Sequence, residues 1–374
     1  MQKEQYLYRT VYEDLRKKIQ EGELRAGQKL PPEQEMSQSY GVSAITVKKA
    51  LSMLAGENLI RRVRGKGSFI TGEEERQESA AAQKKGQPLI GAIFEHISSS
   101  FGQELMYEME RIARQEGYRL FPCFSYGDRK LETEAIRCLT GLGVEGMLIM
   151  PAHGRHYSRE ILRLVLEDFP VVLVDKKMEG IAVASVRTDG EEAMRQLVRY
   201  LSQKGRKQIA LVTVEEVGTS TLIERRAGFY SGMEEEGLIP CPECRLPYLN
   251  YENPFQVYGE VYREQIRQYL KAWKGSLNGI VCAEYGVALE VTAALRELAC
   301  EEAIEVCCID ENYIGSGQYR LTHVKQDEKK MADCAMDLLL KKIRGEELEK
   351  ENYLIPGIFR EGPESRKTKM LQSG

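Results

Sequence analysis

The chain has 374 residues, of which 42% are hydrophobic and 29% are charged, a balance typical of a soluble globular protein rather than a disordered one. This length exceeds one ordinary core, so two or three domains are expected. No stretch approaches the roughly 20 consecutive apolar residues that a membrane span needs, and the charged N-terminus lacks the apolar segment of a secretory signal. We therefore expect a cytoplasmic protein that makes no membrane contact.

The formal net charge of −4 hides an asymmetry along the chain. Residues 1–72 hold 13 Lys/Arg against 8 Asp/Glu, a net +5, whereas the remainder holds 40 against 49, a net −9. A small basic segment joined to a larger acidic one favours a protein that binds nucleic acid at one end only.

The segment 8–71 is dense with helix and turn signals. Val11, Leu15 and Ile19 recur at four-residue spacing, which predicts a helix over 8–21 with one buried face. A glycine and a turn end this helix, so the next element begins in a new direction.

A second predicted helix, 33–40, begins after two prolines and ends before Gly41. Ser43 can cap a third helix, over 44–57. The segment 59–71 alternates apolar and basic residues around two glycines, as a two-stranded wing does. Two helices spaced about a glycine in this way indicate a helix-turn-helix, whose second helix enters the major groove N-terminus first.

The segment 72–87 contains no apolar side chain larger than alanine, so it predicts a mobile linker. The expected domains are a winged helix-turn-helix at 1–71 and a larger ligand-binding and dimerisation domain at 88–374. Short apolar runs recur through this second domain, at 89–95, 118–124, 146–151, 171–175, 208–214, 279–283 and 306–310. Amphipathic helical patterns lie between the runs, as at 104–117, 132–143, 191–205 and 288–299.

This alternation of strand and helix predicts an α/β fold with parallel sheets that are covered on both faces. The second domain is longer than one typical domain, so two similar lobes are expected. Ligands bind beyond the carboxyl ends of the strands in open α/β sheets, so the loops that follow the apolar runs are the expected site.

The first domain resembles the winged helix-turn-helix of the GntR family in the run KLPPEQEMSQSYGVSAITVKKALSMLAGENLIRRVRGKGSFI. In that family, arginines usually occupy the positions that Gln34, Ala44 and Lys48 hold here. Lys48 can still meet a phosphate or a guanine, without the bidentate fork of arginine. The resemblance implies contacts with double-stranded operator DNA from Gln34, Ser43, Ala44, Ile45, Thr46, Lys48, Lys49, Arg64, Gly65 and Lys66. The alternative for any one of them is a solvated surface residue.

The second domain resembles, from 89 to 360, the effector domain of LacI/GalR regulators, which is similar to periplasmic sugar-binding proteins. The resemblance rests on the order of LIGAIFE, SVRTDGEEAMRQLVRYLSQKGRKQIALV, ERRAGF, VCCIDEN and LTHVKQDEKKMADCAMDLLL. A GntR-type head on a LacI-type body is the arabinose-repressor (AraR-like) arrangement. It implies a small-molecule effector, a sugar, bound between two lobes.

Within that resemblance, Arg225 matches an arginine that holds ligand hydroxyls, and Asp310 matches an acidic contact opposite it. Charged groups on both sides suit a polyol, because each can bind two neighbouring hydroxyls. Phe101 is placed to stack on a sugar face, and the further candidates are Tyr126, Asp175, Lys176 and Tyr285. Glu284-Tyr285 stands where the family usually has Asn-Asp. The alternatives are a structural ion pair for Arg225, a turn cap for Asp310 and a core position for Phe101.

Nine cysteines, an odd number in a chain of this length, do not indicate a disulfide framework. Four of them lie inside apolar segments and are expected to be buried free thiols: Cys123, Cys138, Cys282 and Cys334. Cys307 and Cys308 fall in a predicted strand, where neighbouring side chains point to opposite faces.

The spacing of Cys241 and Cys244 is that of a metal or redox pair, but no second pair accompanies it, so a surface loop with two incidental thiols is favoured. His153 and His156 lie in an expected loop with no zinc motif around them. The sequence has neither a phosphate-cradling motif nor a nucleophile elbow. We expect no metal site, no cofactor and no catalysis.

The sequence therefore favours a transcription regulator, most simply a homodimeric repressor whose paired heads read a two-fold symmetric operator. A sugar that closed the two lobes would shift the dimer to a geometry in which the heads no longer fit both half-sites. The alternative is a cytoplasmic carbohydrate-binding protein, or an α/β enzyme, that carries a DNA-binding or interaction head. Removal of 1–72 separates these alternatives, since a regulator would lose DNA binding but keep its ligand.

Overall fold

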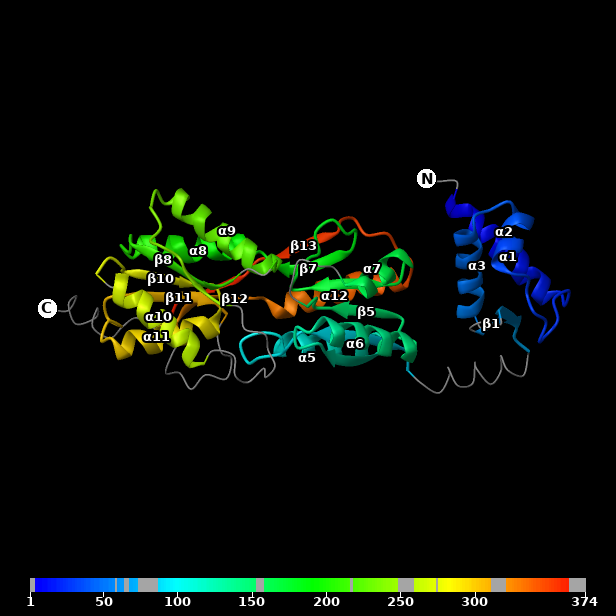
Figure 1. The fold of residues 1–374 in the computed structure, drawn as a ribbon, viewed down its shortest axis with the longest axis horizontal. Helices are drawn as coiled ribbons and strands as arrows, with labels where there is room; N and C mark the ends of the chain where they lie inside the picture. The colour runs from blue at the N-terminus through cyan, green and yellow to red at the C-terminus, as the bar shows by residue number, and fades with distance from the viewer. Residues whose placement is uncertain are drawn as a thin grey trace. The chain divides into compact units, whose positions relative to one another are not determined.

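The computed structural model describes residues 4–57, 59–63, 67–72, 87–152, 158–215, 218–247, 259–273, 275–310 and 321–362. Two compact units make up the chain, Met1–Gln87 and Pro88–Gly374, and we name them the head and the body. Figure 1 draws the elements of both units. Most of the predicted linker, 73–86, lies outside the described residues, so its mobility stays a prediction.

The head folds as three helices and a hairpin: α1 (Glu4–Gln20), α2 (Glu33–Tyr40), α3 (Ala44–Gly56), β1 (Ile60–Val63) and β2 (Gly67–Ile70). β1 and β2 pair antiparallel, and Lys29 bridges to Phe69 beside them. One core collects the inward sides of all five elements: Val11, Leu15, Ile19, Leu30, Met36, Val47, Ala50, Leu51, Leu54, Ile60 and Ile70. The predicted winged helix-turn-helix is confirmed, with the expected buried faces on its first and third helices.

The turn between α2 and α3 is fixed at both of its ends. Gly41 ends α2 with φ 62°, a left-handed conformation that glycine adopts without the steric cost of a Cβ atom. Ser43 then caps α3, because its hydroxyl accepts a hydrogen bond from Thr46 N at 3.1 Å. A short and well-determined turn therefore orients α3 against the rest of the head.

Lobe 1 of the body is a six-stranded sheet in the order β13-β7-β6-β5-β3-β4, and every pairing in it is parallel. Its strands are β3 (Leu89–Phe94), β4 (Arg119–Phe124), β5 (Gly146–Ile149), β6 (Val171–Val174), β7 (Ala184–Thr188) and β13 (Asn352–Ile355). One face packs against α5 (Gln103–Gln115) and α12 (Glu328–Ile343), and the other against α6 (Arg129–Leu142) and α7 (Arg159–Leu166). Each face of the sheet therefore has its own core.

Lobe 2 repeats this plan in the order β14-β12-β11-β10-β8-β9, with β14 as its antiparallel edge strand. Its strands are β8 (Ile209–Val214), β9 (Cys244–Leu246), β10 (Gly279–Cys282), β11 (Glu305–Ile309), β12 (Thr322–Lys325) and β14 (Ile358–Arg360). The helices α8 (Gly190–Gln203) and α9 (Ser220–Glu235) pack against one face, and α10 (Glu260–Trp273) and α11 (Tyr285–Glu297) against the other.

Three described segments cross between the lobes, after β7, after β12 and between β13 and β14, and we name them the crossover region. The Thr188 hydroxyl donates to Gln326 Oε1 at 2.7 Å, and Asp189 N donates to Ile355 O at 2.9 Å, so the three segments lie side by side. The predicted two-lobed α/β body with parallel sheets is confirmed. Figure 1 shows the red strand β13 returning beside the green strand β7.

Five of the described strands of the body lie outside the seven predicted apolar runs, namely β7, β9, β12, β13 and β14. They are three to five residues long. β7 is buried along its whole length yet contains Ser185, Arg187 and Thr188, whose polar groups are hydrogen-bonded. Short strands with paired polar residues leave no apolar run in the sequence, so periodicity does not find them.

The prediction of four buried thiols is wrong for Cys138, which is exposed on α6, and Cys123 and Cys334 are only half-buried. α6 turns Ala135, Ile136 and Leu139 inward, so the position between them points outward. An apolar stretch of sequence therefore placed one residue on the wrong side of an amphipathic helix.

The prediction of a surface loop is wrong for Cys244, which lies in β9 and packs in the core of lobe 2 beside α10. Cys241 is half-buried just before that strand. β9 is a three-residue edge strand, too short to show a strand pattern. Cys307 and Cys308 lie in β11 with no exposed area and belong to cores on opposite faces, as predicted.

Candidate functional site

α3 turns one face to the core and the other to solvent. Its rotation is fixed by four residues with no exposed area: Val47, Ala50, Leu51 and Leu54. The predicted DNA contacts at its N-terminal end are exposed: Ser43, Ala44, Ile45 and Lys48. Since a recognition helix enters the groove by this end, the exposed placement is the one that a DNA-contacting role requires.

The other predicted DNA contacts differ in their exposure to solvent. Gln34 is exposed on α2. Thr46 is half-buried, and its hydroxyl lies 2.7 Å from that of Ser43. The Lys49 ammonium stands 4.5 Å from the centre of the Tyr8 ring, so it lies against α1. The predicted wing contacts lie outside the described residues: Arg64, Gly65 and Lys66.

The carboxyl edge of the lobe 1 sheet carries a buried ion pair. Lys176, directly after β6, donates to the Glu95 carboxylate and to Pro151 O at 3.1 Å. The lysine is 5% exposed and the glutamate 2%. The predicted ligand candidate Lys176 is therefore engaged by partners from the ends of β3 and β5.

The carboxyl edge of the lobe 2 sheet carries a buried aspartate whose hydrogen bonds are incomplete among the described residues. Asp310 follows β11, is 7% exposed, and accepts from Gln326 Nε2 at 3.0 Å through Oδ2. Its Oδ1 is buried and accepts no hydrogen bond from the described part of the chain. Burial raises the pKa of Asp310 to about 7, while the nearby Arg225 lowers it and the Asp175 carboxylate of lobe 1 raises it. Lys177 N of lobe 1 donates to Ser220 Oγ of lobe 2 at 3.1 Å, so the edges of the two sheets lie close together.

Arg225 reaches this edge from α9. Arg225 is 7% exposed, and its guanidinium donates to Ala283 O at 3.0 Å, at the end of β10. Gly228 lets α9 approach α8, because a Cβ there would lie 2.3 Å from Glu191 O. The spacing ERRAGF therefore serves two purposes, since the glycine sets the helix packing and the arginine three residues earlier reaches the strand ends.

Gln326 is a site residue that sequence reasoning missed. It is 2% exposed, directly after β12, and its amide holds Asp310 on one side and the Thr188 hydroxyl on the other. Glutamine matches no chemical motif by itself. The one available signal was its position in the run LTHVKQDEKK, which is part of the resemblance to the LacI/GalR effector domain.

The remaining ligand candidates are spread along the two edges. Asp175 is 8% exposed after β6, and its N–H donates to Val186 O at 2.9 Å. Tyr126 is 41% exposed after β4, stacked with its ring centre 6.1 Å from that of Phe124. Phe101 and Tyr285 are half-buried against the cores of lobe 1 and lobe 2. Phe101 is thus closer to the core position that was its alternative.

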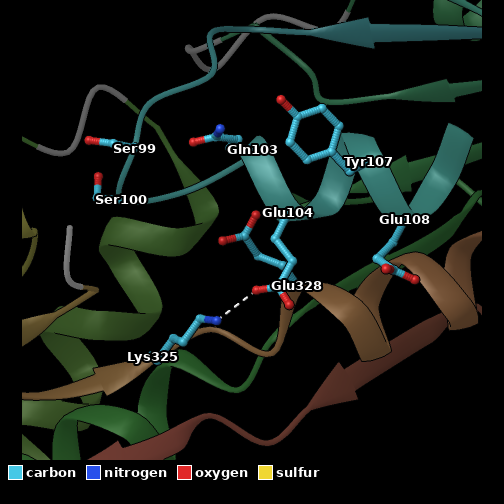
Figure 2. A pocket seen from close by; sticks show the side chains of 8 residues that line it. All are labelled: Ser99, Ser100, Gln103, Glu104, Tyr107, Glu108, Lys325 and Glu328. Atoms are coloured by element: carbon cyan, nitrogen blue, oxygen red, sulfur yellow. Dashed lines mark hydrogen bonds and ion pairs between the residues drawn. The ribbon is translucent and has the colours of Figure 1, made fainter. Parts of the chain in front are cut away.

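A separate cavity of about 210 Å³ lies at the N-terminal end of α5 (Figure 2). It is lined by Ser99, Ser100, Gln103, Glu104, Tyr107, Glu108, Lys325 and Glu328. The Glu328 carboxylate accepts from Gly102 N at 2.8 Å and Leu105 N at 2.9 Å, and Lys325 pairs with Glu104 at 2.6 Å. None of the predicted ligand residues lines this cavity, and its charges are already paired.

The described ranges hold neither a metal-binding cluster nor a membrane-spanning helix. No cluster of three His, Cys, Asp or Glu side chains there is arranged to hold a metal ion. No helix among the same residues is long and apolar enough to cross a bilayer.

Comparison with protein families divides the chain where the head and body divide. Residues 7–70 match the family described as "Bacterial regulatory proteins, gntR family". Residues 87–249 match "Periplasmic binding proteins and sugar binding domain of LacI family", and residues 198–361 match "Periplasmic binding protein-like domain". The chain joins a GntR-type DNA-binding domain to a LacI-type periplasmic-binding-protein domain. It has the domain arrangement of a GntR/LacI-type transcription regulator.

Individual proteins agree with this assignment. The HTH-type transcriptional regulator RegA of Clostridium saccharobutylicum is 29% identical over 270 residues, which cover 71% of this chain and 78% of that protein. The arabinose metabolism transcriptional repressor of Geobacillus stearothermophilus is 21% identical over 360 residues, 93% of this regulator and 94% of that one. A solved periplasmic binding protein/LacI transcriptional regulator from Alkaliphilus metalliredigens, complexed with D-xylulofuranose, has a TM-score of 0.59 at 22% identity, covering 74% and 99% of the two chains. These relatives are regulators rather than enzymes.

Proposed function

We propose that this regulator binds a two-fold symmetric operator as a cytoplasmic homodimer, and that a sugar held between its lobes beside Arg225 and Asp310 controls this binding. The simplest form is a repressor that the sugar releases from DNA. DNA contact is assigned to the exposed end of α3 and to the wing, and dimerisation to the body.

The observation that carries the proposal is the unmet hydrogen-bonding capacity at the lobe 2 edge. Asp310 Oδ1 is buried without a donor from the described residues, and Arg225, which is 7% exposed, donates to Ala283 O at the same edge. Buried polar groups are nearly always satisfied, so such a pair marks a place where a ligand completes the network.

The chemistry of this pair suits a polyol. A guanidinium donates and a carboxylate accepts, so together they bind neighbouring hydroxyls of a sugar by charge-assisted hydrogen bonds. Tyr126, Tyr285 and Phe101 are proposed to supply apolar ring surface to the sugar face. Asp175 is proposed to contact the ligand from lobe 1. The relatives named for arabinose metabolism and bound to D-xylulofuranose make pentoses the first candidates.

Gln326 is proposed to couple the ligand site to the relative orientation of the two lobes. Its amide joins Asp310 to Thr188, and both Gln326 and Thr188 lie in the crossover region. A ligand that hydrogen-bonds to Asp310 would therefore alter the contacts of the crossover region, where a rotation of one lobe against the other would occur. Coupling between effector and operator is bounded by the ligand's differential affinity for the two states, usually about 1–3 kcal/mol.

The test is thermal unfolding of the intact protein against a panel of aldopentoses, ketopentoses and hexoses. A sugar at about 100 times its Kd should add roughly 2.7 kcal/mol to the free energy of unfolding and raise the midpoint by a few degrees. The same sugar should weaken binding of the protein to its operator. Arg225→Ala and Asp310→Ala should each abolish the thermal shift.

Arg226→Ala is the matched control, because Arg226 is the next residue on α9 and pairs with Glu243 at 3.1 Å, away from Asp310. It should keep the full shift. No shift with any sugar, or a shift that survives Arg225→Ala, would refute the sugar assignment. A single-chain mass near 42.6 kDa in light scattering, with operator bound, would refute the homodimer.

A further inference from the structure

The recognition helix presents an isoleucine to solvent where a base pair is expected. Ile45 is 80% exposed, twice the 40% of Leu7, the other exposed large hydrophobic residue among those described in the head. Single apolar side chains on a surface are ordinary and need no explanation by themselves. This one is the second residue of α3, after the Ser43 cap, at the end that enters the major groove.

The Ser43 and Thr46 hydroxyls beside Ile45 already make contacts within the head. The Ser43 hydroxyl caps the helix by accepting from Thr46 N, and it also lies 2.7 Å from the Thr46 hydroxyl. Ala44, beside Ile45, is exposed and apolar. The first turn of α3 therefore offers the groove an apolar surface, and Lys48, one turn later on the same side, is the nearest exposed cation of this helix.

Base edges in the major groove carry one kind of apolar group, the C5 methyl of thymine. Isoleucine has no donor or acceptor, so it gains free energy in the groove only by burying apolar area. We propose that Ile45 recognises a thymine methyl group, so that each operator half-site carries a T·A pair beneath this residue. The proposal rests on the operator binding proposed above, and it adds the identity of one base pair that α3 recognises in each half-site.

The experiment compares thymine with deoxyuridine, which differs only by lacking the methyl group. The intact protein first selects duplexes from a random library, and each thymine of the selected half-site is then replaced in turn. Loss of one buried methyl weakens binding roughly fourfold, so replacement in both half-sites should weaken it about fifteenfold. Fluorescence anisotropy measures the Kd of each duplex.

Ile45→Ala should bind the thymine duplex at least about fifteenfold more weakly and should no longer distinguish it from the deoxyuridine duplex. Its thermal unfolding should match that of the parent protein, because the side chain is exposed. Leu7→Ala is the control for loss of an exposed apolar residue and should keep the full preference for thymine. Lys48→Ala should keep it too, while reducing the dependence of binding on salt.

The outcomes separate the two levels of the proposal. If no thymine is sensitive to replacement, or if Ile45→Ala retains the full sensitivity, the assignment of Ile45 is overturned while operator binding stands. If the library yields no bound duplex, both operator binding and this inference fail.

Discussion

The two lobes build the same frame and use it differently. Each sheet ends a central strand with an aspartate in the left-handed region, Asp175 at φ 68° and Asp310 at φ 69°. In each case the aspartate N–H donates to the neighbouring strand, to Val186 O at 2.9 Å or to Val324 O at 3.0 Å. The backbone at the two positions is nearly equivalent, so differences between them arise from the side chains around them.

Those surroundings diverge. At the lobe 1 edge, Lys176 is held by Glu95 and by Pro151 O, so the charge is compensated inside the lobe. At the lobe 2 edge, Asp310 keeps one oxygen without a described donor, next to Arg225. The two edges thus share a backbone, and each keeps one buried carboxylate oxygen without a hydrogen-bond donor from the described residues, Glu95 Oε1 in lobe 1 and Asp310 Oδ1 in lobe 2. They differ in that Glu95 pairs with a lysine of its own lobe. We therefore expect a structural role for Lys176 and a ligand-binding role for Arg225 and Asp310.

The strongest test of this comparison removes the lysine of the lobe 1 pair. Lys176→Met leaves the Glu95 carboxylate buried without its counter-charge, and loss of one partner of a buried pair typically costs about 3–5 kcal/mol. The free energy of unfolding, measured by denaturant titration, should fall by about that amount. The double variant Lys176→Met with Glu95→Gln should recover part of the loss. Unchanged stability together with a lost sugar response would instead make Lys176 a ligand residue.

A comparable but smaller effect is expected from the pH dependence of Asp310. Its pKa of about 7 in the folded protein lies above the value of 3.8 expected when unfolded. Between these pH values the folded chain holds a proton that the unfolded chain lacks. The stability contributed by this group is therefore fully present below pH 4 and declines as the pH rises towards 7, by up to about 4 kcal/mol.

Asp310→Asn should remove that decline, so the variant should gain on the parent protein between pH 5 and pH 8. Denaturant titrations of both proteins at several pH values measure the difference. Asp175→Asn is the matched control in lobe 1. A parent protein and Asp310→Asn variant with parallel pH profiles would contradict the raised pKa.

A third prediction concerns the Thr188–Gln326 hydrogen bond, which joins the crossover region to Asp310. Thr188→Val keeps the shape of the side chain but removes the hydroxyl that donates to Gln326 at 2.7 Å. The loss of one buried hydrogen bond should lower the free energy of unfolding by about 1 kcal/mol. It should also weaken sugar binding by a few-fold, because Gln326 then holds Asp310 less firmly. Unaltered sugar affinity, measured by calorimetry, would show that Asp310 orients Gln326 rather than the reverse.

The parts of this molecule that the sequence predicts are those set by local periodicity. Val11, Leu15 and Ile19 recur with the helical repeat, and the short turn from Gly41 to Ser43 has its own residue chemistry, so the head could be predicted almost element by element. The seven apolar runs of the body correspond to β3, β4, β5, β6, β8, β10 and β11. The short strands with paired polar residues were missed, because burial there follows from partners elsewhere in the chain.

The candidate site was predictable only in part for the same reason. Arg225 and Asp310 came from motifs, and the structure brings them together. The pairing of Lys176 with Glu95 joins positions 81 residues apart, and no local pattern reports it. Gln326 acquires its role only where the crossover segments meet. Contacts between distant segments are therefore what the sequence alone could not provide.

The smallest expected effect concerns the contacts that join the lobes directly. Lys325 pairs with Glu104 at 2.6 Å, with side chains 28% and 40% exposed, whereas Arg187 pairs with Glu224 at 3.0 Å, with side chains 7% and 12% exposed. Water and salt screen the first pair, so Lys325→Met should change the free energy of unfolding by less than about 1 kcal/mol. Glu224→Gln should cost more, because it leaves a buried guanidinium short of its charge partner. If Lys325→Met proved the costlier change, the lobes would be joined at the α5 end rather than through α9, and the cavity of Figure 2 would gain a part in the coupling.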